Sequence, residues 1–305
     1  MRSPAAAWRG LAWLALLLAA SAALAQSRGW SFAENDNAVM AAQSGGGQAA
    51  AAGPVRVEFY GHMAFRITTP RGLGILIDPW RNDPSGAWGL WFPAEFPEIA
   101  VDLVLSTHAH FDHDAVHRPH ATSVLERLAG RLELGDAVIT GLADKHVCEA
   151  PGWYAWDASG PEFGQHFCPP DNPLHMDNFI QVVTTGGLRI AHWGDNRAQP
   201  APYADAALAG VDVLILPIDA SHHLLSDDDV AAIIARYRPR LVIPAHYHMP
   251  GTSSVLTTLG PAAEWVGRQP RVRRLDGASV ELNAADLPAR EAWEVLYFGD
   301  HAARD

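Results

Sequence analysis

Three histidines and one aspartate lie within six residues of the chain: His108, His110, Asp112 and His113. They directly follow an apolar run, residues 101–105, which is typical of a buried strand. Because residues two apart in an extended segment point the same way, His108 and His110 can bind one ion together. The chain must then turn, which allows Asp112 and His113 to face a second ion beside the first. Imidazole and carboxylate ligands without a thiolate are typical of catalytic zinc sites, which keep one position open for water.

Two more candidate ligands follow strand-like segments further along the chain. Asp195 comes shortly after the run 188–192, and His246 comes after the run 241–243 and a Pro-Ala pair. On a layered α/β scaffold, rigid strands hold the side chains of the short loops at their ends. We therefore expect Asp195 and His246 to contribute to the same active site as the ligands in 108–113.

The elements that position these residues begin near residue 55. Apolar and alternating segments at 55–60, 64–69 and 74–78 predict three strands, separated by turn signals. Further along we expect a helix over 122–128, a strand over 137–140, a hairpin over 178–192, a strand over 211–218, a helix over 226–237 and a strand over 241–243. Ser226 caps the second helix, whose first turn carries three aspartates at the positive end of its dipole.

The N-terminus has the pattern of an export signal. Residues 1–25 combine two arginines, an apolar run and a small-x-small cleavage site, Ala23-Leu24-Ala25. An uncleaved anchor is the alternative, but the apolar run is short for a membrane span. We expect a protein exported to a bacterial periplasm, with no stable membrane insertion after cleavage. Residues 26–54, rich in Ala, Gly, Gln and Ser, predict a flexible lead-in to a single domain over 55–301.

Composition narrows the classes of partner. The 305-residue chain is long enough to bury a large core, and 49% of its residues are hydrophobic. Its net charge is −12, and Lys145 is the only lysine, so nucleic acid is not expected as a partner. A small-molecule substrate is expected instead.

The only two cysteines are Cys148 and Cys168. In an oxidising compartment an even pair favours a disulfide, which would close a segment rich in Pro, Gly and aromatic residues. Two free thiols are the alternative. Neither cysteine belongs to a metal-ligand pattern.

Taken in order, these motifs resemble the metallo-β-lactamase superfamily, and more narrowly its ascorbate-phosphate-lactonase-like and phosphodiesterase-like hydrolases. The resemblance covers about residues 55–301. It rests on six segments: 59–65, Ile77-Asp78-Pro79-Trp80, 108–113, 174–178 with His175, 192–196 with Asp195, and 243–247 with His246. The resemblance implies an α/β fold, a four-layer αββα sandwich that holds a dinuclear metal site between its sheets.

The resemblance also implies two ligand sets. The first ion takes His108, His110 and His175, and the second takes Asp112, His113 and His246, with Asp195 shared between them. Two Zn²⁺ ions are expected, with manganese or iron as alternatives. His166 is a nearby competitor for His175, and His248 is a competitor for His246.

Other side chains are candidates for supporting roles in the site. For most of them a purely structural role is the alternative. The resemblance implies that Asp78 braces the metal loop. His192 is expected to pack or to hydrogen-bond a ligand, and His62 either lines the pocket or stabilises its own turn. Arg197 binds a substrate anion or pairs with a local acid. His222, with its neighbour His223, is a substrate-facing acid or oxyanion partner, or belongs to a solvated loop.

The chemistry expected of such a site is hydrolysis by a metal-bridging hydroxide. Asp112 and Asp195 are the expected catalytic carboxylates, and an ester, lactone or phosphodiester is the expected substrate. The tryptophan-containing segment 82–92 is expected to form a lip that favours an apolar or ring-bearing substrate. The alternatives are an exported β-lactamase and an iron-dependent redox enzyme on the same fold. No role is predicted for His117, His120, His146 and His301.

Overall fold

The computed structural model describes residues 52–147, 176–221, 223–255 and 257–304. All of them fall within one compact unit, residues 37–305. The predicted signal, most of the predicted lead-in, Cys148, Cys168, His166, His175 and His222 lie outside the described residues. No helix in the described ranges is both long and apolar enough to cross a membrane.

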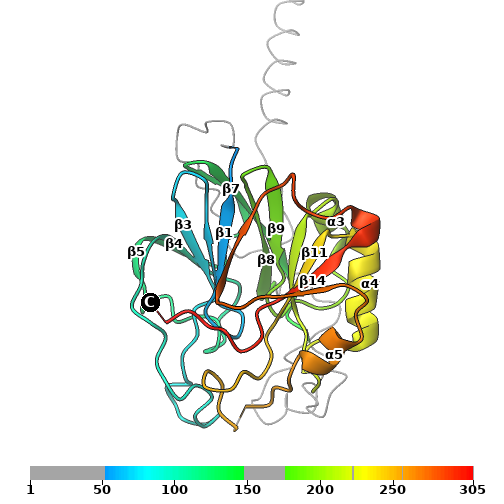
Figure 1. Ribbon diagram of the computed structural model, residues 1–305. Helices are drawn as coiled ribbons and strands as arrows, with labels where there is room; N and C mark the ends of the chain where they lie inside the picture. Colours follow the sequence, from blue (N-terminus) through cyan, green and yellow to red (C-terminus); the bar gives the residue numbers. More distant parts are fainter. Residues whose placement is uncertain (1–51, 148–175, 222, 256, 305) are drawn as a thin grey trace, which may run out of the picture. The chain divides into compact units, whose positions relative to one another are not determined.

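Two mixed β-sheets form the centre of the domain (Figure 1). The six-stranded sheet has the order β13-β1-β2-β3-β4-β5, and the eight-stranded sheet has the order β12-β14-β11-β10-β9-β8-β7-β6. The bounds of the first sheet are β1 (Val55–Phe59), β2 (Phe65–Thr68), β3 (Gly74–Ile77), β4 (Ala100–Ser106), β5 (His120–Glu126) and β13 (Ser279–Leu282). Those of the second are β6 (Gly130–Leu134), β7 (Ala137–Asp144), β8 (Asn178–Thr185), β9 (Leu188–His192), β10 (Val213–Pro217), β11 (Leu241–Ala245), β12 (Val272–Arg274) and β14 (Glu294–Tyr297).

The core lies between the two sheets. Alternate residues of β3 and β4, such as Ile75 and Leu103, share one buried cluster with Ile190 of β9 and Ile215 of β10. A strand exposes alternate side chains on opposite faces, so each sheet contributes one apolar face to this layer. The sheets therefore pack face to face, and the predicted α/β sandwich is confirmed.

The two outer faces are covered differently. Three helices, α3 (Pro202–Leu208), α4 (Asp227–Tyr237) and α5 (Ala263–Gly267), lie beside the eight-stranded sheet (Figure 1), and a short 3₁₀ helix, η1 (Arg290–Ala292), precedes β14. Residues 52–147 contain no helix. Leu76 and Val104, on the outer face of the six-stranded sheet, pack instead in a separate apolar core with Trp80, Phe92 and other apolar residues of the segment 79–99.

Most of the predicted elements are present. The three opening strands, the hairpin β8–β9 and the strands β10 and β11 are confirmed. The hairpin turns at Gly186 and Gly187, which both have positive φ, as tight turns between strands require. Helix α4 begins with a capping box between Ser226 and Asp229.

The helix predicted over 122–128 is wrong, because this segment forms β5. Its residues pair in parallel with β4, Val124 opposite Val104 and Leu125 opposite Leu105. The segment includes β-branched residues, and a ladder with a neighbouring strand satisfies its backbone, so tertiary pairing overrides the helical pattern.

Gly141 offers a test of the packing between β7 and the chain that leads into β6. A Cβ at this position would overlap the carbonyl of Leu128. We expect Gly141→Ala to lower the free energy of unfolding by about 3 kcal/mol, the upper end of typical overpacking effects. Gly277→Ala is the control, since a Cβ there meets nothing within 4 Å and should change stability by less than about 1 kcal/mol. Urea denaturation measures both, and equal stabilities of the two variants would contradict the packing.

Candidate metal centre

Asp78 organises the loop that follows β4. It lies just after β3 in the left-handed region, with a φ of 55°. Its carboxylate accepts hydrogen bonds from the Thr107 backbone nitrogen at 2.7 Å and from Thr107 Oγ1 at 2.7 Å. The same carboxylate lies 2.8 Å from His113 Nδ1. Asp78 thus holds both ends of the turn that carries the histidines, the position that the family resemblance implies for it.

One cluster of candidate ligands consists of His108, His110, His146 and Asp195. One ligand atom from each residue lies within 4.8 Å of those from the others. The Oδ2 atom of Asp195 is 3.7 Å from His108 Nε2 and 3.4 Å from His146 Nε2. His110 is exposed, whereas the other three are buried. This cluster is therefore open on the side of His110.

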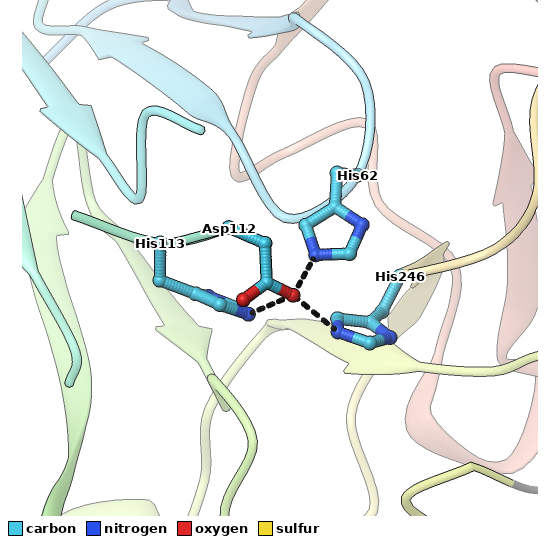
Figure 2. A group of neighbouring side chains, drawn as sticks. All are labelled: His62, Asp112, His113 and His246. Carbon is cyan, nitrogen blue, oxygen red and sulfur yellow. Dashed lines mark hydrogen bonds and ion pairs between the residues drawn. The ribbon is translucent and has the colours of Figure 1, made fainter. Parts of the chain in front are cut away.

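A second cluster consists of His62, Asp112, His113 and His246 (Figure 2). Its ligand atoms also lie within 4.8 Å of one another, and all four residues are buried. The imidazole nitrogens converge on Asp112 Oδ2, at 2.9 Å from His62 Nε2, 3.5 Å from His113 Nε2 and 3.6 Å from His246 Nε2.

Asp195 faces both clusters. Besides its contacts in the first cluster, its Oδ1 is 3.3 Å from His113 Nε2 and its Oδ2 is 3.5 Å from His246 Nε2. Asp195 follows Gly194, which has a φ of 57° and no room for a Cβ, because Asn178 Oδ1 and Thr107 Oγ1 would each lie 2.8 Å from it. A shared carboxylate between two ligand sets is the geometry of a two-metal site.

The third histidine of the first cluster is His146. It follows β7 by two residues, and an isolated bridge joins it to Asn196 beside Asp195. The sequence predicts His175 for this place and no role for His146. The structure brings His146 to the other ligands. His175 lies outside the described residues, so its position is not compared. The signal for His146 is its position just beyond the end of β7. The sequence pattern predicts that this strand ends at residue 140, whereas β7 extends to Asp144.

The remaining candidates have other partners. His192 Nε2 bonds the Met63 carbonyl oxygen at 2.8 Å, which fits a packed, supporting histidine. Arg197 donates to Asp144 at 2.7 Å, so its guanidinium pairs with a local acid. His223 lies against the second cluster, with its ring stacked on His246 at 5.8 Å and 11°. His117 and His120 are exposed.

The unpartnered atoms of the site fit metal ions. Within the described residues, His108 Nε2, His113 Nε2, His246 Nε2 and Asp195 Oδ1 are buried without a hydrogen-bond partner. Buried polar atoms are normally paired, and an unpaired one needs an explanation such as an ion. Imidazole nitrogen and carboxylate oxygen are both zinc ligands, with manganese and iron as further options. These donor atoms therefore fit two divalent cations.

The pKa shifts in the metal-free site also favour positive charge beside the two carboxylates. Burial lowers the pKa of His246, but the nearby carboxylates of Asp195 and Asp112 outweigh it and raise this pKa to about 9. Burial also opposes ionisation of Asp195, yet His113 and His246 hold the pKa of Asp195 well below its usual range. Protons thus supply in the metal-free site the positive charge that cations supply in the loaded one.

Several known proteins are similar to this domain as a whole. A family model described as "Beta-lactamase superfamily domain" matches residues 56–246. The chain is 30% identical over 233 residues to a UPF0173 metal-dependent hydrolase of Anaeromyxobacter sp. (strain K), covering 65% of this chain and 76% of that protein. It is 38% identical over 220 residues to one of Thermodesulfovibrio yellowstonii, covering 64% of this chain and 79% of that protein.

A solved structure from Thermotoga maritima, named for a Zn-dependent hydrolase of the metallo-β-lactamase superfamily, has a similar fold. The two structures align with a TM-score of 0.55 at 18% identity, over 80% of this chain and 98% of that one. At this identity the likeness concerns the fold.

Replacing His146 tests the composition of the first cluster. We expect His146→Ala to bind close to one zinc per chain where the unmodified protein binds two, because the first cluster loses one of its three imidazoles. Elemental analysis after dialysis measures the ratio, with His117→Ala as the exposed control. An unchanged ratio in His146→Ala would show that another residue fills this position.

The raised pKa of His246 gives a pH dependence in the metal-free protein. Its pKa rises from 6.5 to about 9 on folding, so between these values the native state binds more protons than the unfolded state. Stability from this group is therefore fully present below pH about 6.5 and is lost as the pH rises through about 9. Urea unfolding of metal-free protein across this range should show the loss, and His246→Asn should flatten it. A slope identical in both proteins would contradict the assignment.

Proposed function

Because this chain belongs to the β-lactamase superfamily and is a metal-dependent hydrolase of the metallo-β-lactamase fold, we propose that it is a dinuclear zinc hydrolase of esters, lactones or phosphodiesters. The observation that carries this proposal is the position of Asp195, which faces both clusters of candidate ligands. Its carboxylate is placed to be shared by two ions, one in each cluster.

The side chains divide into two ligand sets around Asp195. His108, His110 and His146 would hold one ion, and Asp112, His113 and His246 would hold the other. Two such ions would supply a water of lowered pKa and would polarise the carbonyl or phosphoryl group of a substrate. A hydrolase of this kind needs no Ser, Cys or Lys nucleophile, and none of these residue types belongs to the two clusters.

Asp112 and Asp195 act as carboxylates. Burial opposes ionisation of Asp112, but the nearby His113 and His246 and the hydrogen bond to His62 hold the pKa of Asp112 well below its usual range. An ionised Asp112 is suited to hold a cation, whereas a general base would need a pKa near the working pH. Asp195 keeps the two ligand sets in register.

His223 is the side chain best placed to meet the substrate oxyanion. It is buried beside His246, and its Nδ1 lies 3.2 Å from Thr258 Oγ1, which fixes the ring. A ring held in this way is preorganised to donate a hydrogen bond to charge that develops in the transition state. The sequence offers this role for His222 and its neighbour His223, with a solvated loop as the alternative; His223 is buried, and His222 lies outside the described residues.

The proposed lip, residues 82–92, would favour a substrate with an apolar or ring-bearing group through its exposed part, because Trp91 and Phe92 are buried in the apolar core. Trp91 packs edge-on against Phe111, with ring centroids 5.2 Å apart, and Phe111 lies between two of the ligands in the chain. Asn82 accepts hydrogen bonds from the Trp91 and Phe92 backbone nitrogens at 2.8 and 2.9 Å, which holds the predicted lip in place. Leu90 beside them is 51% exposed.

The predicted export signal adds a proposed location in the periplasm. A periplasmic hydrolase would meet substrates that enter the cell envelope, which also suits the alternative of an exported β-lactamase. An iron-dependent redox enzyme is the second alternative. Metal analysis separates it from hydrolysis, since native iron in place of zinc would support the redox chemistry.

Turnover by the mature chain, residues 26–305, tests the proposal. The substrates are an aryl phosphodiester, an aliphatic lactone and a chromogenic cephalosporin, each with and without a chelator. We expect chelator-sensitive hydrolysis of the phosphodiester or the lactone. Hydrolysis of the cephalosporin alone would favour the β-lactamase alternative. No turnover of any of the three by protein that holds two ions would overturn the proposed substrate classes.

Two substitutions separate metal binding from transition-state stabilisation. Asp195→Ala should abolish turnover together with metal binding, because it removes the shared carboxylate. His223→Ala should keep both ions and lower kcat by about 100-fold, as loss of one oxyanion donor does. Steady-state kinetics and elemental analysis on the same samples check both. Full activity of His223→Ala would remove His223 from the mechanism.

A further inference from the structure

His62 lies in a turn beside the second cluster and directs its ring towards the carboxylate of Asp112 (Figure 2). Its φ is 57°, in the left-handed region that few residues other than glycine adopt. Two other site residues, Asp78 and His246, have φ values of 55° and 58°. Strain of this kind costs about 1–3 kcal/mol and concentrates at functional sites. A glycine or an asparagine would form the same turn more easily, so the imidazole itself needs a reason.

The turn delivers the His62 ring to the ligands. The His62 carbonyl oxygen accepts a hydrogen bond from the His246 backbone nitrogen at 2.8 Å. The two rings consequently lie 4.0 Å apart, and His62 is fully buried. The preceding Gly61 has no room for a Cβ, which would lie 2.6 Å from Thr252 Cγ2. The backbone is thus fixed on both sides of His62.

The distances around Asp112 match those between ligands of one ion. Atoms bound at about 2.0–2.1 Å to one zinc lie about 2.9 Å apart at right angles and about 3.3 Å apart at tetrahedral angles. Asp112 Oδ2 is 3.5 Å from His113 Nε2 and 3.6 Å from His246 Nε2, and it is 2.9 Å from His62 Nε2, which it hydrogen-bonds in the metal-free site. His192 provides the contrast, because its Nε2 bonds a backbone carbonyl and its ring does not belong to either group of candidate ligands.

We propose that His62 is a direct ligand of the ion in the second cluster, which gives this ion four buried protein ligands besides the shared Asp195. The proposal rests on the two-ion function proposed above. It makes the two positions unequal. The ion among His62, Asp112, His113 and His246 is enclosed and binds tightly, whereas the ion beside the exposed His110 is the exchangeable one, with the open position for substrate.

Titration of the metal-free mature chain with cobalt tests this assignment without any substrate. The affinity of each bound cobalt ion and its absorption spectrum are measured. We expect two steps, a tight one and a weaker one. His62→Asn keeps a residue that tolerates the left-handed turn, so the fold should survive. In this variant the tight step should weaken by more than about 100-fold and its absorption spectrum should change. Loss of a residue that only hydrogen-bonds a ligand typically weakens binding by about 10–100-fold.

Two further variants complete the design. His110→Ala should remove the weaker step and leave the tight one, and His192→Asn is the matched control for a buried histidine outside the cluster. A tight step in His62→Asn within 100-fold of the unmodified protein, with the same spectrum, would overturn direct ligation. If the unmodified protein bound a single ion, the two-ion function would fail as well. If it bound two ions and His62→Asn changed neither step, only this inference would fail.

Discussion

The burial of two carboxylates among imidazoles is the constraint on which the rest of the structure depends. Asp112 and Asp195 are each about nine-tenths or more buried, and three imidazole nitrogens around them have no hydrogen-bond partner in the described part of the chain. Such groups are costly away from water unless opposite charge or ligation compensates them. Divalent cations provide that compensation, and the polar cluster between two apolar sheets is then consistent with a stable fold.

The sandwich supplies the rigidity that this cluster needs. Candidate ligands lie at or just beyond the ends of β4, β7, β9 and β11, and the core between the sheets fixes those ends relative to one another. Asp78 adds a local brace, since it bonds both Thr107 and His113. Only His62 reaches the site from a turn of the antiparallel part of the six-stranded sheet, and its backbone bond to His246 connects that turn to the same frame.

The sequence predicts the parts of the site that are encoded locally. His108, His110, Asp112 and His113 are recognisable because their spacing along one strand and turn is itself the signal. The third histidine of the first cluster cannot be assigned in this way. Its identity depends on how far β7 extends and on which residues the neighbouring strand β8 brings alongside. No local pattern distinguishes His146 from the other histidines of that region.

The wrong prediction of a helix over 122–128 has the same cause, a long-range contact. It forms an edge strand because β4 offers a parallel partner, which an isolated stretch of sequence does not reveal. The role of His62 was also ambiguous, because a turn histidine is uninformative until the turn is seen to face His246. Long-range pairing therefore accounts for what the sequence left open, in the fold and in the site alike.

Diffraction data collected at the zinc absorption edge from crystals of the zinc-loaded mature chain would test the central claim most directly. Two anomalous peaks are expected about 3.5–4 Å apart. One should lie among His62, Asp112, His113 and His246, the other among His108, His110 and His146, with Asp195 between them. A single peak, or a pair of peaks that Asp195 does not join, would contradict a dinuclear centre built on this carboxylate.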